Sequence, residues 1–359
     1  MKLTIEQPAF AAALARVAYA VASKATLPIT QYVLISASDG VTITATNLDA
    51  EVQAKAYATV ETEGAVAVPF KMLSDVVKKM PKGALISIDS GKGVIDVKAG
   101  RVSVTIATLL AEDFPHMASD KYDFEMMLDP DQIANLFGKV SFAASVEETR
   151  YYLRGVYIHA SDDGLTGVAT DGHRLAKWAC DVDATGMPSV IIPSETIPMI
   201  GSPEMPVKMQ VSAGKVRFSD DTWSLVSKVV DGTFPDYTRI IPERKGTIAR
   251  FAGKDMKASV DLVGAVLDKT NNAVAMDIGA DGIGVFGRTG TNLIEDHIAA
   301  EIEGDPVRIG FNSKYVTSAM QHLEGNAVMY VVDAGSPARI EDDADAAFTL
   351  VIMPMRLQS

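Results

Sequence analysis

The sequence has little of what covalent or metal-dependent chemistry requires. It contains a single cysteine, Cys180, so no internal disulfide can form, which fits a reducing cytoplasm. It shows neither a glycine-rich phosphate loop nor a serine in a nucleophile elbow. No spacing typical of a metal site connects its histidines, which are His116, His159, His173, His297 and His322. We therefore expect no cofactor, no metal site and no catalytic residues.

Long apolar runs are also absent. No stretch approaches the roughly 20 apolar residues that a membrane-spanning helix needs. The first residues, MKLTIEQPAF, lack a basic region followed by an apolar segment, so we expect no secretory signal and a cytoplasmic protein without a membrane partner. Hydrophobic residues make up 48% of the chain and charged residues 22%, which is typical of a folded protein.

Positive charge is outweighed by negative charge. The chain has 33 Lys and Arg against 46 Asp and Glu, a net charge of −13. An acidic surface repels phosphates, which argues against non-specific binding of nucleic acid. The argument holds only for a surface that is uniform, because an acidic protein can still be basic on one concave side.

What the sequence does contain is a threefold repeat. The strand KLTIE with the helical pattern PAFAAALARVAYAVA recurs as YDFEMML with DPDQIANLFGKVSFAA, and as IARFAG with KDMKASVDLVGAVL. Asp129 and Pro130 predict the start of the second of these helices. A strand, an Asp-Gly turn and a strand follow in each repeat, and then a short strand leading into a second helix, which Pro198 interrupts in the middle copy.

Three repeats in 359 residues give about 120 residues each, the usual size of a domain. We predict an α+β fold of three tandem copies of one domain, each with two helices packed on antiparallel sheet. The predicted domains are residues 1–119, 120–243 and 244–359. Six such domains in a ring leave a hole on the order of 35 Å, wide enough for a DNA duplex, whereas three do not. A head-to-tail dimer closes such a ring if the rotation between its copies allows.

Charge on the predicted helices gives this idea partial support. The first repeat carries Arg16, Lys71, Lys78 and Lys79, with only Asp75 opposing them. The helices of the other repeats are nearly neutral. Solvated helix faces explain these lysines equally well, but a closed ring is held by topology and does not need tight phosphate contacts.

At this point the chain resembles the bacterial sliding clamps, the beta subunits of DNA polymerase III. The resemblance covers the whole chain and rests on TLPI, TRYYLRGV, ATDGHRLA, VDGTFPDY, IGFN and MPMRL, which occur in the order of the family. It implies a homodimeric ring of six domains that encircles duplex DNA without sequence preference and confers processivity on the replicative polymerase. It also implies that polymerase, clamp loader and repair proteins share a peptide-binding pocket between the second and third domains.

The resemblance assigns residues to that pocket, hereafter the predicted peptide site. The deeper part comprises Leu153, Thr170, Gly172, His173, Arg174, Leu175, Pro235, Arg239, Ile240, Val351 and Met353. The shallower part comprises Arg150, Tyr152, Asn312, Tyr315, Pro354, Met355 and Arg356. Pro337 replaces a small polar residue at the rim. The adjacent methionine and proline in IMPM suit an adaptable apolar surface, and tyrosine and arginine are favoured at binding hot spots.

The resemblance also assigns DNA-facing and subunit-contact residues. Lys24 keeps the positive charge of a family position, and Lys71 lies at another, whereas Ser194 and Glu195 stand where the family often has basic residues. For the dimer, the strand around Val102 and Val104 is expected to meet Val266 and Leu267 of the other copy.

Two alternatives remain open from the residues alone. Asp171 and His173 are two apart and point the same way on an extended segment, as in a catalytic pair, but no nucleophile or metal accompanies them. The other alternative is a ring-forming scaffold for protein interactions that does not act on DNA.

Overall fold

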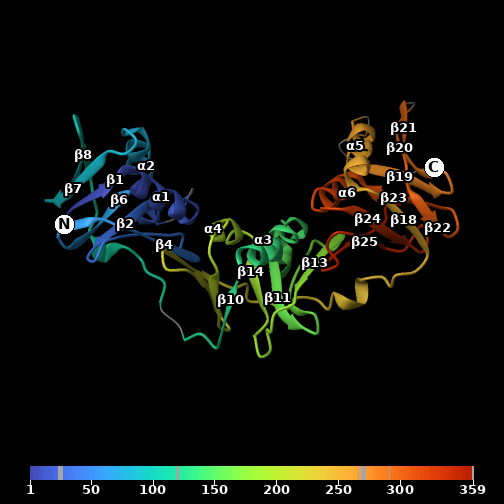
Figure 1. The fold of residues 1–359 in the computed structure, drawn as a ribbon, viewed down its shortest axis with the longest axis horizontal. Helices are drawn as coiled ribbons and strands as arrows, with labels where there is room; N and C mark the ends of the chain where they lie inside the picture. Colours follow the sequence, from blue (N-terminus) through green and yellow to red (C-terminus); the bar gives the residue numbers. More distant parts are fainter. Residues whose placement is uncertain (23–26, 119–120, 266, 268–271, 291, 358–359) are drawn as a thin grey trace. The chain divides into compact units, whose positions relative to one another are not determined.

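The computed structural model describes residues 1–22, 27–118, 121–265, 267, 272–290 and 292–357. Its elements recur three times, each repeat beginning with a strand that leads into a helix (Figure 1), and the central repeat has one strand fewer between its two helices. The predicted α+β fold of three tandem repeats is confirmed. Predictions for Lys24 and Val266 lie outside the described residues.

The first repeat has two full helices. Its elements are β1 (Lys2–Glu6), α1 (Gln7–Val17), the 3₁₀ turns Ala18–Ala20 and Pro28–Gln31, β2 (Tyr32–Ala37), β3 (Val41–Thr46), β4 (Ala50–Ala56), β5 (Thr59–Thr62), β6 (Gly64–Pro69), α2 (Phe70–Lys79), β7 (Leu85–Gly91), β8 (Val94–Ala99), β9 (Val102–Ala107) and the 3₁₀ turn Ala111–Asp113. Phe10, Leu14 and Val17, which fall at helical spacing in the predicted helix PAFAAALARVAYAVA, are buried. The regular helix ends at Val17, so Val21 lies beyond it.

The central repeat has a shortened second helix. Its elements are β10 (Phe124–Leu128), α3 (Pro130–Gly138), the 3₁₀ turns Ser141–Ala143 and Glu148–Leu153, β11 (Gly155–Ser161), β12 (Gly164–Thr170), β13 (Arg174–Cys180), β14 (Val190–Pro193), α4 (Ile197–Ile200), β15 (Val207–Val211), β16 (Lys215–Ser219), β17 (Trp223–Lys228) and the 3₁₀ turn Thr238–Ile240. Helix α3 begins at Pro130 as predicted. Pro198 lies in the first turn of α4, where proline is tolerated, and the helix ends after 4 residues at Gly201, which has a φ of +67°.

The third repeat again has two helices. Its elements are β18 (Thr247–Ala252), α5 (Gly253–Gly264), β19 (Ala273–Gly279), β20 (Gly282–Thr289), β21 (Asn292–Ile298), β22 (Glu301–Glu303), β23 (Val307–Asn312), α6 (Ser313–Met320), β24 (Asn326–Val331), β25 (Ala338–Asp342) and β26 (Phe348–Ile352). Met256, Val260 and Val263, which fall at helical spacing in the predicted helix KDMKASVDLVGAVL, are buried. Leu267 continues this spacing, but it follows the end of α5 at Gly264.

Two sheets continue from one repeat into the next. In one sheet the order is β10-β15-β16-β17-β4-β3-β2-β6, so β17 of the central repeat pairs with β4 of the first. In another, β13 of the central repeat pairs with β26 of the third, with Leu175 opposite Val351. Smaller sheets, β5-β1-β7-β8-β9 and β21-β20-β19-β23, complete the outer repeats.

Because strands of neighbouring repeats share sheets, the compact units of the structure do not coincide with the repeats. The chain divides into one unit of Met1–Ile133 with Gly186–Val230 and another of Ala134–Thr185 with Asp231–Ser359. The central repeat therefore contributes to both units. Boundaries of repeats and of compact units are different divisions of the chain, and the domain boundaries predicted from the sequence stay a prediction.

Candidate peptide-binding site

The centre of the predicted peptide site is the tight loop between β12 and β13. Gly172 has a φ of +88°, which an L-residue adopts only with strain. The Thr170 hydroxyl accepts from the Gly172 N–H at 3.1 Å and donates to the Arg174 carbonyl at 2.6 Å. The loop is thus held by its own side chains, and Gly172 and His173 at its tip are exposed.

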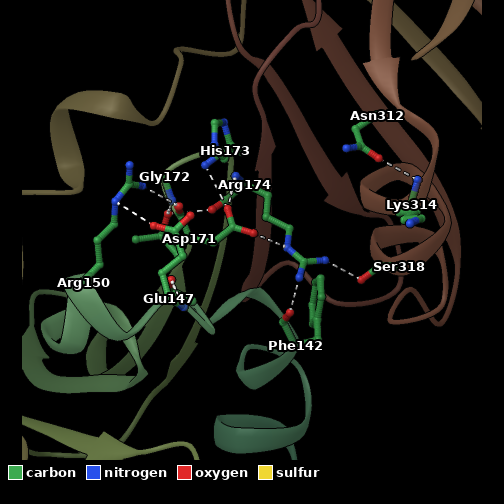
Figure 2. Close-up of polar contacts among 12 residues, drawn as sticks. Phe142, Glu147, Arg150, Asp171, Gly172, His173, Arg174, Asn312, Lys314 and Ser318 are labelled. Atoms are coloured by element: carbon green, nitrogen blue, oxygen red, sulfur yellow. Dashed lines mark hydrogen bonds and ion pairs between the residues drawn. The ribbon is translucent and has the colours of Figure 1, made fainter. Parts of the chain in front are cut away.

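Asp171 serves this loop and not a catalytic relay. Its Oδ1 accepts from the backbone N–H groups of His173 at 2.9 Å and Arg174 at 3.0 Å, while its Oδ2 faces the Arg174 Nε at 3.1 Å (Figure 2). The His173 ring instead lies 6.3 Å from the ring of Tyr315, nearly parallel to it. Within the described ranges no group of His, Cys, Asp and Glu is arranged to hold a metal ion. Asp171 thus shapes the loop.

Arg174 is the hub of the site. Its guanidinium donates to the Phe142 carbonyl at 2.6 Å and to the Ser318 hydroxyl at 2.8 Å (Figure 2). The same group lies 5.3 Å from the centre of the Phe142 ring and 4.8 Å from that of Tyr315. Since Phe142 follows α3 and Ser318 lies on α6, one side chain ties the central repeat to the third.

Arg150 flanks the loop on its other side. Its Nη1 donates to the Asp171 carbonyl at 3.2 Å and its Nε lies 3.2 Å from Glu147 (Figure 2). A Cβ atom built on Gly172 would lie 3.0 Å from the Arg150 guanidinium. The absence of a side chain at Gly172 therefore lets Arg150 lie against the loop backbone.

The β13–β26 pairing provides the apolar floor. Leu153, Thr170, Leu175 and Val351 are all buried, whereas Met353 just beyond β26 is exposed. The Met353 N–H donates to the His173 carbonyl at 2.8 Å, which carries the chain end along the loop.

Beyond Met353 the chain end runs against β23. The Met355 N–H donates to the Gly310 carbonyl at 2.8 Å. A Cβ atom on Gly310 would lie 2.6 Å from the Met355 carbonyl oxygen and 2.7 Å from Leu357, so only glycine permits this approach. Pro354 and Met355 are half-buried here and Arg356 is exposed.

The segment after β17, at the end of the central repeat, supplies the exposed Pro235, Arg239 and Ile240. Its buried Phe234 stacks on Tyr157 with ring centres 4.8 Å apart, and Tyr237 donates to or accepts from His159 Nε2 at 2.9 Å. Burial disfavours the charged form of both side chains. It raises the pKa of Tyr237 to about 12 and lowers the pKa of His159. Both groups are therefore neutral at pH 7.

Asn312 and Tyr315 belong to the third repeat. Asn312 caps α6, since its side chain accepts from the Lys314 N–H at 3.0 Å (Figure 2). Burial, with the Asp171 charge, raises the pKa of the half-buried Tyr315.

Tyr152 is half-buried and packs edge-on against Tyr151 with ring centres 5.7 Å apart. Pro337, the predicted departure at the rim, is half-buried before β25.

The structure also contains a link that the sequence does not signal. The buried Lys139 amine lies 2.6 Å from Asp345 and 2.8 Å from Glu324, and the Trp178 indole N–H donates to Asp345 at 3.1 Å. Burial on its own lowers the pKa of Lys139, but the hydrogen bonds with Asp345 and Glu324 outweigh it and the pKa is raised. These partners are far apart in the sequence, and no local pattern announces them.

The predicted DNA-facing residues differ in their surroundings. Lys71, Lys78 and Lys79 are exposed on α2. Arg16 instead donates to the carbonyls of Met199 at 2.6 Å and Ile200 at 3.0 Å. Its contact with DNA stays a prediction, but its guanidinium already has protein partners.

The described subunit-contact residues lie in two places, on β9 and just after α5. Val102 and Val104 are half-buried on β9, the outer strand of its sheet. Leu267 is also half-buried, just after the end of α5.

No helix among the described residues has the length and hydropathy needed to cross a membrane.

Comparison with known proteins agrees with this architecture. Successive segments match the N-terminal domain of the DNA polymerase III beta subunit at residues 1–118, its central domain at 127–236 and its C-terminal domain at 238–356. The beta sliding clamp of Caulobacter vibrioides is 35% identical over 99% of this chain and all of its own, and that of Escherichia coli is 30% identical with the same coverage.

Solved structures give the same answer. A Caulobacter crescentus beta sliding clamp superposes with a TM-score of 0.95 at 34% identity, covering 99% of each chain. A Bartonella birtlesii clamp bound to griselimycin has the same TM-score at 33% identity, covering 99% of this chain and 100% of its own. The chain therefore belongs to the DNA polymerase III beta subunit family, the bacterial beta sliding clamps, and is a non-catalytic processivity factor of that polymerase. DNA and the polymerase are its partners.

Proposed function

We propose that two copies of this chain form a closed ring around duplex DNA. The carrying observation is that the domain occurs three times, because three domains alone leave no hole for a duplex whereas six do. A ring that encloses DNA is retained by topology, so its net charge of −13 does not prevent binding. Such a ring acts in the cytoplasm, where the chromosome is replicated.

Two open strand edges support head-to-tail closure. β9 is the outer strand of the sheet β5-β1-β7-β8-β9, and β21 is the outer strand of the sheet β21-β20-β19-β23. An outer strand offers unpaired N–H and C=O groups to another chain. In the proposed homodimer β9 of one copy pairs with β21 of the other, and Val102 and Val104 pack against the end of α5 near Leu267.

The exposed lysines of α2 supply weak contacts to the phosphates inside the ring. Lys71, Lys78 and Lys79 carry no ion pair among the described residues. Such contacts are independent of sequence and permit sliding, since each is exchanged for a neighbouring phosphate at little cost. The clamp loader opens and closes this ring on DNA.

The experiment that tests the ring uses topology. Labelled protein is loaded onto nicked circular DNA by a clamp loader with ATP, and the isolated complex is then cut once. Retention on the intact circle in high salt and loss on linearisation are expected. Equal retention on both forms would mean ordinary contact binding. Failure to load despite an active loader control would favour a ring-forming scaffold that does not act on DNA.

We further propose that the predicted peptide site binds short segments of the polymerase, the clamp loader and other clamp-binding proteins. Buried apolar side chains at its floor and exposed arginine, histidine and methionine at its edge provide the anchor and rim that peptide hot spots need. Griselimycin, bound in the Bartonella relative, is a suitable probe. Met353→Glu is expected to weaken its binding, whereas Met72→Glu, at an exposed methionine of α2, should not. Equal binding to both variants would place the ligand elsewhere.

A further inference from the structure

A cavity lies in the unit formed by Met1–Ile133 and Gly186–Val230. Its volume is about 840 Å³, and it is bordered by β10, the segment after α4 and the turn between β16 and β17. None of its lining residues belongs to the predicted peptide site. A cavity of this size is large enough to take one or two side chains of a partner.

The walls of this cavity are apolar and adaptable. Met127 on β10 is 55% exposed and Met205 is 64% exposed, while Trp223 and Ile200 are buried. Arg16 covers one face of the Trp223 ring at 3.7 Å from its centre. Two exposed methionines beside a fixed tryptophan form a surface that can adjust to an apolar side chain.

The charges around this cavity are unbalanced. Both cations of the lining have partners, because Arg16 donates to the Met199 and Ile200 carbonyls and Lys208 lies 2.9 Å from Glu125. Glu204 and Asp221 have no ion pair in the described part of the chain. Their free negative charge favours a cationic ligand and repels phosphate.

Strand β10, which borders the cavity, also has an open edge. The corresponding first strands of the outer repeats have neighbours on both sides, since β1 pairs with β5 and β7, and β18 pairs with β22 and β24. Among the described residues β10 pairs with β15 alone. An extended segment can add to such an edge through main-chain hydrogen bonds, and pockets beside it then select the side chains.

We propose that the β10 edge and this cavity form a docking site for an extended basic segment of a partner protein. The segment adds as a strand to β10, places an apolar side chain between Met127 and Met205, and directs lysine or arginine toward Glu204 and Asp221. This site is additional to the predicted peptide site and selects the opposite charge from DNA.

The test uses a fluorescein-labelled peptide with the sequence Thr-Lys-Val-Leu-Val-Lys-Thr and measures anisotropy at physiological ionic strength. Binding to the intact protein is expected. Glu204→Lys with Asp221→Lys should weaken binding by about tenfold or more, because attraction becomes repulsion. The matched control, Glu63→Lys with Asp162→Lys, changes two exposed carboxylates elsewhere by the same net charge and should leave binding unchanged.

A second peptide separates strand addition from charge attraction. N-methylation of alternate amides keeps every side chain but removes the hydrogen bonds to β10, and should weaken binding by about tenfold. Equal loss in the control variant, or insensitivity to N-methylation, would overturn the proposal. So would absence of binding to the intact protein. If the Glu204 and Asp221 substitutions change the mass of the protein alone in sedimentation, the occupant is a second copy of this chain and the proposal is wrong.

Discussion

The two junctions between successive repeats share a construction and differ in charge. At the first, β4 pairs with β17 and Arg16 bonds the carbonyls of Met199 and Ile200 over Trp223. At the second, β13 pairs with β26 and Arg174 bonds the Phe142 carbonyl between two aromatic rings. A shared sheet with an arginine set against an aromatic ring is thus a recurrent way of joining repeats in this chain.

The rims of these junctions differ. Glu204, Asp220 and Asp221 border the cavity at the first junction, whereas Arg150, His173 and Arg356 lie at the second. The shared sheet and the arginine fix the backbone, while the rim residues come from loops outside the sheets. The same construction therefore carries rims of different composition, and the difference lies in the loops.

The largest expected effect on stability is at Arg174, in the second junction. Arg174→Ala removes the bonds to Phe142 and Ser318 and leaves the mostly buried Asp171 without its cation, so the free energy of unfolding should fall by about 4 kcal/mol. Urea unfolding followed by circular dichroism measures the change. Arg239→Ala, at a side chain that is 84% exposed, is the control and should cost less than about 1 kcal/mol. Similar losses in both variants would contradict the role of Arg174 in joining the repeats.

Lys139→Met tests the second junction, where this amine is buried, whereas the Lys228–Asp49 ion pair that crosses the first junction is exposed. Removing the amine that holds Asp345 should lower the free energy of unfolding by about 3 kcal/mol at pH 7. The folded-state pKa of Lys139 is raised above 10.5, so this stabilisation is complete below pH 10.5 and is lost as the pH rises through the folded pKa. Urea unfolding across this range is the measurement. A difference from the unsubstituted protein that persists unchanged at the highest pH would show that packing, not charge, is responsible.

Arg16→Ala breaks the first junction in the same way but should cost less, about 2 kcal/mol, because no buried carboxylate is left behind. Burial lowers the pKa of Arg16 to about 10, so the group is still charged at neutral pH. Thermal or urea unfolding measures the change in stability, and retention of the protein on nicked circular DNA measures the change in DNA binding. Arg16→Ala could instead leave the free energy of unfolding unchanged and alter the salt dependence of retention on DNA. Arg16 would then contact DNA, and it would not join the repeats as Arg174 does.

The smallest effect is expected at Gly172. Gly172→Ala places a Cβ atom at a φ of +88° and 3.0 Å from Arg150, which should cost about 1 kcal/mol. Because the strain falls on the loop of the predicted peptide site, griselimycin affinity should fall more than overall stability does. Gly214→Ala is the control, since nothing lies within 4 Å of the added atom. Unchanged affinity would mean that Arg150 does not need to lie against the loop.

The sequence predicts the elements well because their signals are local. Phe10, Leu14 and Val17 follow helical spacing, α3 begins at Pro130, and Pro198 lies in a second helix of a single turn, α4. The predicted α+β repeat, the family and the non-catalytic processivity function are confirmed. The residue assignments of the peptide, DNA and subunit sites stay predictions, although the structure brings Thr170, Arg174 and Val351 to one place.

What the sequence does not predict is set by distant pairings. Nothing near Trp223 indicates that Arg16 covers its ring, and nothing near Lys139 indicates Asp345, since each pair is joined only by folding. Asp171 and His173 show the opposite case, in which a local pattern suggests a function that the structure does not support. Their spacing suits a catalytic pair, but the Asp171 carboxylate is occupied by backbone N–H groups of its own loop, a use that aspartate commonly has in turns.

The continuation of sheets across repeats bears on how the molecule can be dissected. A fragment containing only the central repeat would carry β17 without β4 and β13 without β26, so two strands that are internal to sheets in the whole chain would become bare edges. Bare edges of apolar strands invite association with other chains. Such a fragment is expected to aggregate when expressed alone, and a truncation series should yield soluble protein only when each cut leaves both members of a shared strand pair on the same polypeptide.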